Sequence, residues 1–147
     1  MASIIETFAY ARAGLIGNPS DGYYGKTISI SVRNFRARVL CYPAANLEIR
    51  GSAIDQPVWR SIDELREGVK KYGYYGGIRL IRAIIKRFAD YCDEKGIRLP
   101  KRNCALEYES DIPGRVGLAG SSAIITATLR ALMQFYEVEI PKEIQPN

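Results

Sequence analysis

The stretch "NCALEYESDIPGRVGLAGSSAIITATLRAL", residues 103–132, changes its hydrophobic pattern at a glycine-rich loop. Its first part alternates between apolar and polar residues, which predicts a β-strand over 103–111. Its last part is apolar and helix-like, and it predicts a helix from about residue 121 to residue 135. The loop between them carries glycines at positions 114, 117 and 120. A strand, a flexible turn and a helix N-terminus in this order are typical of an anion-binding site.

The physical basis for such a site is the start of the helix. The first amides of a helix have no intrahelical partner, and the helix dipole adds about half a positive charge at that end. Glycines let the backbone approach a phosphate closely and adopt positive φ angles. Ser121 and Ser122 can cap the helix, and a hydroxyl at this position can also coordinate Mg²⁺. The alternative is a plain glycine-rich connection in which Ser121 serves only as the N-cap.

Two familiar phosphate-binding loops do not fit the letters of this stretch. A Walker-type loop needs a lysine before its serine or threonine, whereas Gly120 is followed directly by two serines. A dinucleotide-binding loop needs the spacing GxGxxG soon after a first strand, whereas the spacing here is GxxGxxG. The phosphate-binding hypothesis therefore rests on backbone amides rather than on a lysine.

The N-terminal part of the chain predicts a group of strands. Residues 3–13 alternate loosely and lead into the turn-rich loop 17–26. The stretch 26–42 alternates well, with a phase slip near Asn34 that predicts a bulge or bend in a long antiparallel strand. Residues 46–51 predict a short partner strand for it.

Helices are predicted after these strands. Ser61 with Glu64 three residues later is a capping-box pattern, and Gly73 can end that helix. Residues 78–95 form an amphipathic helical pattern, with Gly96 following as the C′ residue. Because most strands precede the helices, the order favours an α+β layer architecture over a doubly wound sheet.

Composition narrows the class of molecule. The 147 residues suffice for one domain, and 47% apolar and 25% charged residues are ordinary for a globular protein. The chain contains no histidine, which excludes histidine acid–base catalysis and histidine metal ligands. The three cysteines are widely spaced and odd in number, so we expect reduced, buried thiols. The N-terminus does not resemble a signal peptide and no apolar run is long enough for a membrane span, so we expect a cytoplasmic protein.

A second polar cluster follows the first predicted strand. The segment "YARAGLIGNPSDGYYGK", residues 10–26, places Arg12 at the strand end and Asn18, Ser20 and Asp21 in the loop directly after it. Arg12 can stabilise the charge of a transferring phosphoryl group or lower the pKa of an attacking hydroxyl. The loop side chains can bind sugar hydroxyls. The alternative is a surface turn in which Asp21 serves an Asx-turn.

Together the two segments resemble the motifs of the GHMP small-molecule kinases, named for the galactose, homoserine, mevalonate and phosphomevalonate kinases. "ARAGLIGNPSDGYYG" resembles the first motif of that family, and "IPGRVGLAGSSA" resembles its phosphate loop. The usual loop of the family runs GLGSSA or GLSSSA, whereas this one carries an extra residue, Ala119 or Gly120. With "GNPSDGYYGKT" and "YGYYGGIRL", this form is similar to the branch that phosphorylates glucuronic acid at its anomeric position.

The resemblance implies a fold, cofactors and residue roles. The fold is the one named for ribosomal protein S5 domain 2, a mostly antiparallel sheet with helices on one face, which we expect to be incomplete here. The implied cofactors are ATP and Mg²⁺, and the implied partner is a sugar or sugar acid. Arg12 would stabilise the transferred phosphoryl charge, whereas Asn18, Ser20 and Asp21 would bind the substrate. Ser122 would contact Mg²⁺, and the loop would hold the ATP phosphates through Gly114, Gly117, Leu118, Ala119, Gly120, Ser121 and Ser122.

The resemblance also marks a departure. In the sugar kinases of the family a catalytic aspartate lies beyond the second motif, and a third glycine-rich motif lies in a C-terminal domain. Neither has a counterpart up to Asn147. We therefore expect residues 1–147 to form a truncated N-terminal, ATP-binding domain, with little turnover alone and with association through the surface that truncation exposes. The alternative is a non-catalytic nucleotide- or metabolite-binding fragment or subunit.

Nucleic acid is a further class of partner to consider. The net charge is +5, and basic residues alternate with tyrosines in "KKYGYYGGIRLIR", residues 70–82. A net charge of this size fits anionic small molecules equally well. Solvated helix faces explain the basic residues more simply, so neither nucleic acid nor a membrane is the expected partner.

Overall fold

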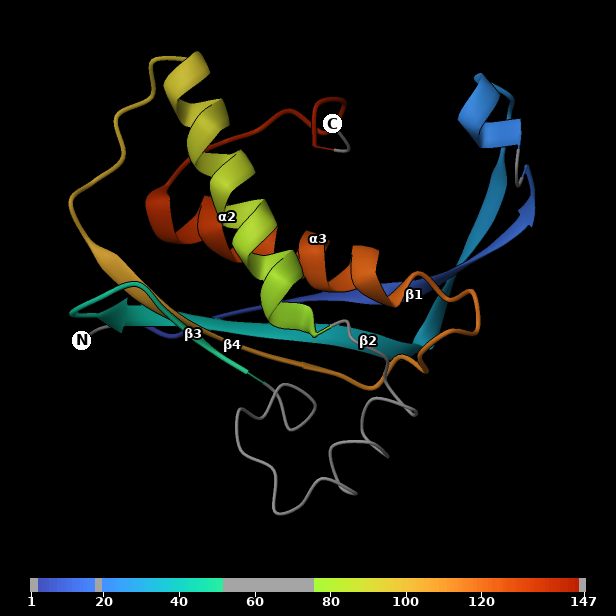
Figure 1. The fold of residues 1–147 in the computed structure, drawn as a ribbon, viewed down its shortest axis with the longest axis horizontal. Helices are drawn as coiled ribbons and strands as arrows, with labels where there is room; N and C mark the ends of the chain where they lie inside the picture. The colour runs from blue at the N-terminus through green and yellow to red at the C-terminus, as the bar shows by residue number, and fades with distance from the viewer. Residues whose placement is uncertain (1–2, 18–19, 52–75, 146–147) are drawn as a thin grey trace.

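The computed structural model describes residues 3–17, 20–51 and 76–145. Over these ranges the chain forms one four-stranded sheet, and two long helices cover one face of it (Figure 1). The elements in chain order are β1 (Ile5–Ile16), the 3₁₀ helix η1 (Ser20–Tyr23), β2 (Ile28–Ala44), β3 (Glu48–Arg50), α2 (Gly77–Glu94), β4 (Asn103–Ser110) and α3 (Gly120–Tyr136).

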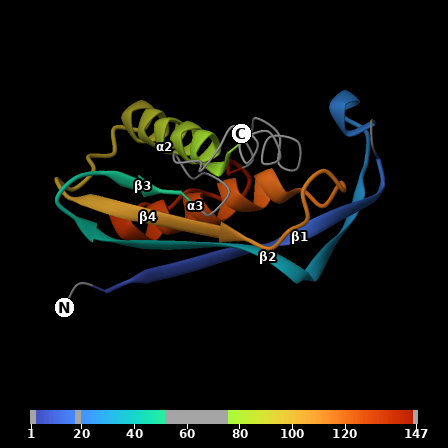
Figure 2. The same ribbon diagram turned by 60° about the horizontal axis from the view of Figure 1, so that its bottom comes forward.

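The sheet is mostly antiparallel, with the strand order β1-β2-β4-β3. Strand β2 pairs antiparallel with both β1 and β4, whereas β3 pairs parallel with β4. Helices α2 and α3 lie on the same side of this sheet, which Figure 2 shows from a second direction. The predicted α+β architecture, with a mostly antiparallel sheet and helices on one face, is confirmed.

The position of β3 differs from the prediction that residues 46–51 would pair with the long strand. Strand β4 lies between β2 and β3, so that the short strand pairs with β4 instead. Residues 104–106 of β4 are buried at three consecutive positions, which suits an inner strand with both edges paired. The sequence of β3 is Glu-Ile-Arg, and charged residues of this kind suit an edge strand.

The predicted bulge near Asn34 is confirmed. Tyr10 pairs with Arg36, but its neighbour Ala11 pairs with Val32, so residues 33–35 of β2 have no partner on β1. A second irregularity in the register falls between Gly14 and Ile16. Beyond the bulge the two strands form an arm that bends toward the side of the sheet that carries the helices (Figures 1 and 2).

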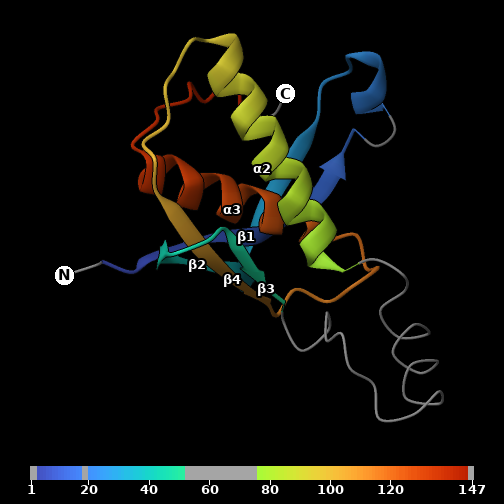
Figure 3. The same cartoon turned by 60° about the vertical axis from the view of Figure 1, so that its left-hand side comes forward.

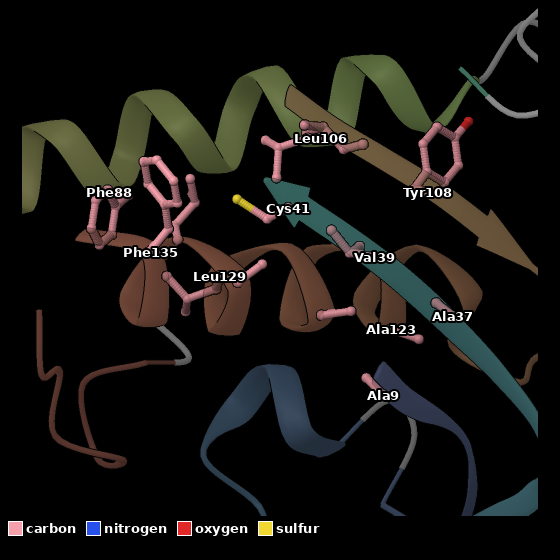
Figure 4. Packing of buried hydrophobic residues seen from close by; sticks show 14 of the residues in the cluster. Ala9, Ala37, Val39, Cys41, Phe88, Leu106, Tyr108, Ala123, Leu129 and Phe135 are labelled. Carbon is pink, nitrogen blue, oxygen red and sulfur yellow. The ribbon is translucent and has the colours of Figure 1, made fainter. Parts of the chain in front are cut away.

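Small residues let α3 lie close against the sheet. Ala123, Ala127 and Ala131 follow one another at i, i+4 and i+8 on α3, and all three are buried. They face the inward side of β1 and β2, which also presents small buried residues such as Ala9 and Ala37 (Figure 4). One polar contact lies in this layer, because the Thr7 hydroxyl donates a hydrogen bond of 2.7 Å to the Ala127 carbonyl.

Helix α2 covers α3 with the face that its periodicity predicts. Ile81, Phe88 and Cys92 are buried on that face, and the Phe88 ring lies 6.0 Å from the ring of Tyr136 at the end of α3. The helix ends as predicted, because Gly96 follows the C-cap with a φ of 66°.

The third strand of the antiparallel set completes the core. Cys104, Leu106 and Tyr108 of β4 point toward the helices and are buried, as the alternation predicts. All three cysteines are free and buried, which confirms the expectation of reduced thiols.

The predicted helix start at Ser61 and stop at Gly73 lie outside the described residues. No helix within the described ranges is long and apolar enough to cross a membrane.

Candidate functional site

The strand that carries Arg12 and the glycine-rich loop are joined by a backbone hydrogen bond. The N–H of Arg12 donates to the carbonyl of Leu118 at 3.0 Å. Because β1 is an edge strand whose other side pairs with β2, this bond places the loop along the outer edge of β1. Two segments more than a hundred positions apart in the sequence therefore meet at one place.

The start of the loop is fixed to the sheet by Asp111. Its carboxylate oxygen Oδ1 accepts a hydrogen bond of 2.6 Å from the N–H of Arg36, and its own N–H donates to the Arg36 carbonyl at 3.2 Å. The next residue, Ile112, is buried, and a Cβ added to Gly120 would lie 3.4 Å from its Cγ2 atom. Neither residue was among the predicted site residues. A serine–aspartate pair at a strand end is a turn signal that could have indicated Asp111.

The start of α3 corrects the prediction of a serine cap. The helix begins at Gly120, and its N-cap is Ala119, which makes no side-chain capping hydrogen bond. Ser121 and Ser122 are therefore the second and third residues of the helix rather than its caps. The physical reason is the left-handed conformation of Ala119, with φ 56° and ψ 38°, which turns the chain into the helix before the serines.

This start leaves three amides available to a ligand. The first helical hydrogen bond runs from the N–H of Ala123 to the Ala119 carbonyl at 3.0 Å. The amides of Gly120, Ser121 and Ser122 precede it and so have no intrahelical partner. Both serine side chains are exposed, and neither hydroxyl makes a hydrogen bond to a described residue. An anion placed here would meet backbone donors, two hydroxyls and the positive end of the α3 dipole.

The loop itself follows an open path. Arg115 and Gly117 have positive φ angles of 62° and 77°, so the chain turns repeatedly before it reaches α3. A Cβ added to Gly114 or Gly117 would meet no atom within 4 Å. The space beside both residues is therefore free for a bound group, whereas Leu118 packs against the core.

Helix α2 begins at the end of the helical layer where the glycine-rich loop enters α3 (Figure 3). Its first residue, Gly77, donates its N–H to the hydroxyl of Tyr108 at 3.0 Å. A Cβ at Gly77 would lie only 2.3 Å from the Tyr108 ring, so the close approach requires glycine. Tyr108 thus fixes the start of α2 next to the end of β4, from which the loop leaves.

Arg12 is exposed and has no acidic partner among the described residues. Arg38, in the covered part of the sheet, behaves differently, because it donates hydrogen bonds to both Glu6 and Glu109. The hydrogen bond to Glu109 and then the one to Glu6 raise the pKa of Arg38 above its ordinary value. The charge of Arg38 is therefore balanced within the sheet, whereas that of Arg12 is available to a ligand.

The predicted substrate residues lie further out along the arm. Ser20 and Asp21 belong to η1, which connects β1 and β2 at the tip of the arm (Figure 1). Asn18 lies outside the described residues. Among the residues that the structure describes, no group of three or more cysteine, aspartate or glutamate side chains could hold a metal ion. A metal at this site would need other ligands.

Comparisons with known proteins identify relatives of the chain. Residues 79–145 match the family described as the GHMP kinases N terminal domain. Two Arabidopsis thaliana proteins named Glucuronokinase 1 and Probable glucuronokinase 2 are each 43% identical to the chain, over 97% and 98% of its length. The chain spans 40% of the length of each relative.

Solved structures share the fold at lower sequence identity. The Methanococcus jannaschii mevalonate kinase has a TM-score of 0.66 at 21% identity, and the match covers 99% of this chain and 44% of that one. A D-glycero-D-manno-heptose 1-phosphate kinase from Bacteroides thetaiotaomicron also has a TM-score of 0.66, at 18% identity, covering 97% of this chain and 45% of that one.

Proposed function

Because the chain belongs to the GHMP kinase family, we propose that residues 1–147 form the N-terminal, ATP-binding domain of a sugar 1-kinase. The reaction would transfer the γ-phosphoryl group of ATP to the anomeric hydroxyl of D-glucuronate or a related sugar. The names of the two Arabidopsis relatives, at 43% identity, support this choice of substrate. Since the chain spans 40% of their length, the complete reaction would need further polypeptide.

The observation that carries the proposal is the hydrogen bond between Arg12 and Leu118, at 3.0 Å. It brings Arg12, which has no acidic partner among the described residues, to a loop that ends in three amides without intrahelical partners. The amides of Gly120, Ser121 and Ser122 would bind phosphate oxygens at the start of α3. The Arg12 guanidinium would stabilise the charge on the transferring group. The rest of the loop, with Gly114 and Gly117 facing open space, would let the phosphates approach the backbone.

The site also fits a magnesium ion that is held mainly by its ligand. Mg²⁺ prefers six oxygen ligands and usually keeps several waters, with one or two protein oxygens and substrate phosphates completing its shell. The exposed hydroxyl of Ser122 would supply a protein oxygen next to the phosphate-binding amides. A bound Mg²⁺ would neutralise part of the phosphate charge. This arrangement needs no acidic cluster in the chain.

The sugar would lie toward the tip of the arm. Asn18, Ser20 and Asp21 follow β1 directly, and we propose that they bind the sugar hydroxyls. Catalysis would rest on positioning and on charge stabilisation, as in other phosphoryl transfers. The aspartate that the family places beyond the second motif would be contributed by further polypeptide.

Two measurements test the proposal. Titration calorimetry on residues 1–147 should detect binding of Mg²⁺–ATP. An assay for ADP on the same chain should detect little turnover. A fusion of this chain to the remaining C-terminal part of one of the Arabidopsis relatives should then release ADP when D-glucuronate is added. Activity on other sugars but on no sugar acid would contradict the choice of substrate.

A second candidate function is favoured by the 40% coverage of the relatives. The chain could act as a nucleotide-binding fragment or subunit without catalysis of its own. That function requires Mg²⁺–ATP binding but no turnover at any chain length. Lack of Mg²⁺–ATP binding to the isolated chain would contradict both functions.

A further inference from the structure

Arg33 lies in the bulge of β2 and stacks on an aromatic ring of β1. Its guanidinium carbon lies 5.8 Å from the centre of the Tyr10 ring. Tyr10 precedes Arg12 by two positions on the same strand, so the two residues share one face of β1. Residues two apart on a strand are separated by about 7 Å. The bulge therefore places a second guanidinium on the face of β1 that carries Arg12.

The charges of this pair are not balanced within the described part of the chain. Neither Arg12 nor Arg33 makes an ion pair or hydrogen bond with a described carboxylate, in contrast to Arg38. An anion that binds beside either guanidinium would balance its charge. Tyr10 is 40% exposed, so a ligand can reach the stacked pair.

We propose that Arg33 binds the carboxylate of a hexuronic acid and thereby sets the preference of the site for a sugar acid over a neutral sugar. The inference rests on the proposed sugar-kinase function and names the residue that selects its substrate. A guanidinium matches a carboxylate in plane and can donate two parallel hydrogen bonds to it. The cation–π contact with Tyr10 holds the guanidinium in one place, which reduces the ordering that binding requires.

The order of the groups along β1 matches the order of the groups on the sugar. In a hexuronic acid the anomeric carbon lies between the ring oxygen, which leads to the carboxyl-bearing carbon, and the carbon that bears the 2-hydroxyl. Along the arm, Arg12 lies between Arg33 with Tyr10 on one side and η1 on the other. With the anomeric hydroxyl near Arg12, the hydroxyls extend toward η1 and the carboxylate extends toward Arg33.

Arg36 offers a matched control. It stacks on Phe8 in the same way, with its guanidinium carbon 5.0 Å from the ring centre. Phe8 is two residues further from Arg12 than Tyr10 is, on the same strand face. A substitution of Arg36 removes the same charge and the same kind of contact from outside the proposed carboxylate site.

The test measures dissociation constants for D-glucuronate and for D-glucose by NMR titration of residues 1–147 with Mg²⁺ and a non-hydrolysable ATP analogue. Loss of a charge-assisted hydrogen-bonded contact should weaken glucuronate binding about tenfold or more in Arg33→Gln. Glucose binding and the affinity for the ATP analogue should stay as in the wild type. Arg36→Gln keeps the backbone N–H and carbonyl that hold Asp111, so it should leave all three affinities unchanged.

Several results would overturn the inference. It fails if Arg33→Gln weakens both sugars equally, if Arg36→Gln has the same effect as Arg33→Gln, or if the wild type does not bind glucuronate more tightly than glucose. In each case, retained binding of the ATP analogue leaves the nucleotide-binding function standing. Loss of ATP-analogue binding in the wild type would instead contradict the proposed function itself.

Discussion

The inner and outer halves of the β1–β2 hairpin differ in burial and in the pairing of their charged residues. In the inner half, small and aliphatic residues of both strands lie under α3. On the polar face of the sheet, Arg38 forms ion pairs with Glu6 and Glu109. In the outer half, Ile28 and Ile30 are 54% and 47% exposed, and Arg12 has no described acidic partner. The bulge at residues 33–35 separates the two halves. The difference indicates that the inner half stabilises the domain, whereas the outer half is free to meet a ligand or further polypeptide.

The largest effect should come from a pair of aliphatic truncations on either side of the bulge. Val39 is fully buried, so Val39→Ala should lower the free energy of unfolding by about 2 kcal/mol through lost burial and a residual cavity. Ile30→Ala removes more atoms but should cost less than about 1 kcal/mol, because the side chain is already half exposed. Urea denaturation of the two variants measures both values.

The same variants test the surface of the arm. We expect the isolated chain to associate through its exposed apolar residues, and Ile30→Ala should reduce that association in sedimentation experiments. A larger stability loss for Ile30→Ala than for Val39→Ala would contradict the division of the hairpin into two halves.

A pair of serine substitutions addresses ligand binding. Ser122→Ala should weaken Mg²⁺–ATP binding about tenfold, because it removes a hydroxyl next to the unpartnered amides. The matched control is Ser29→Ala, which removes an exposed hydroxyl from the outer part of β2. It should leave the affinity unchanged, and neither variant should alter the unfolding transition. Calorimetric titrations measure both affinities, and an equal loss of affinity in the two variants would argue against a specific role of Ser122.

A smaller effect is expected at the N-cap of α3. Ala119 has a φ of 56°, a conformation in which an L-residue is strained and glycine is not. Ala119→Gly should therefore raise the free energy of unfolding by up to about 1 kcal/mol, offset in part by the entropy of glycine in the unfolded chain. A clear destabilisation in thermal unfolding would show that the left-handed N-cap is not as described.

The smallest effect concerns the polar face of the sheet. Tyr42 donates a hydrogen bond to Glu107, which together with Arg50 lowers the pKa of that carboxyl below its ordinary value of 4.5. A lowered pKa in the folded state stabilises the protein above the pKa of the unfolded chain, and the stabilisation is lost as the pH falls through the folded value. The melting temperature of Tyr42→Phe should thus lie slightly below that of the wild type at neutral pH. The two melting temperatures should converge once the pH falls below the lowered pKa of Glu107 in the folded protein, and a difference that persists there would contradict the ionic origin.

Much of the fold was predictable because its signals are local. The alternation of β2, its phase slip at Asn34 and the amphipathic pattern of α2 each depend on neighbouring residues, and each prediction is confirmed. The pairing of β3 was not, because the choice of a strand partner depends on which strand fills the centre of the sheet. Sequence patterns rank strands poorly by this property.

The elements around the candidate site were predictable, but the contacts that bring them together were not. The glycine spacing indicated a phosphate loop, but a serine pair at a helix start reads as a cap, and the left-handed Ala119 leaves no mark in the sequence. The bond from Arg12 to Leu118 uses only backbone atoms, so any residue could make it. The stacking of Arg33 on Tyr10 depends on the exact length of the bulge. These contacts are tertiary, and a local pattern cannot encode them.

The most direct test of the central claim is an NMR titration of the isolated, isotope-labelled chain with Mg²⁺–ATP. The backbone amides of Gly120, Ser121 and Ser122 should show the largest chemical-shift changes, because they are the donors at the start of α3 that have no intrahelical partner. The chemical shifts of amides in the inner half of the hairpin, such as that of Val39, should not change. If Mg²⁺–ATP leaves the three loop amides unchanged, or shifts amides elsewhere while these stay fixed, the glycine-rich loop is not the phosphate site.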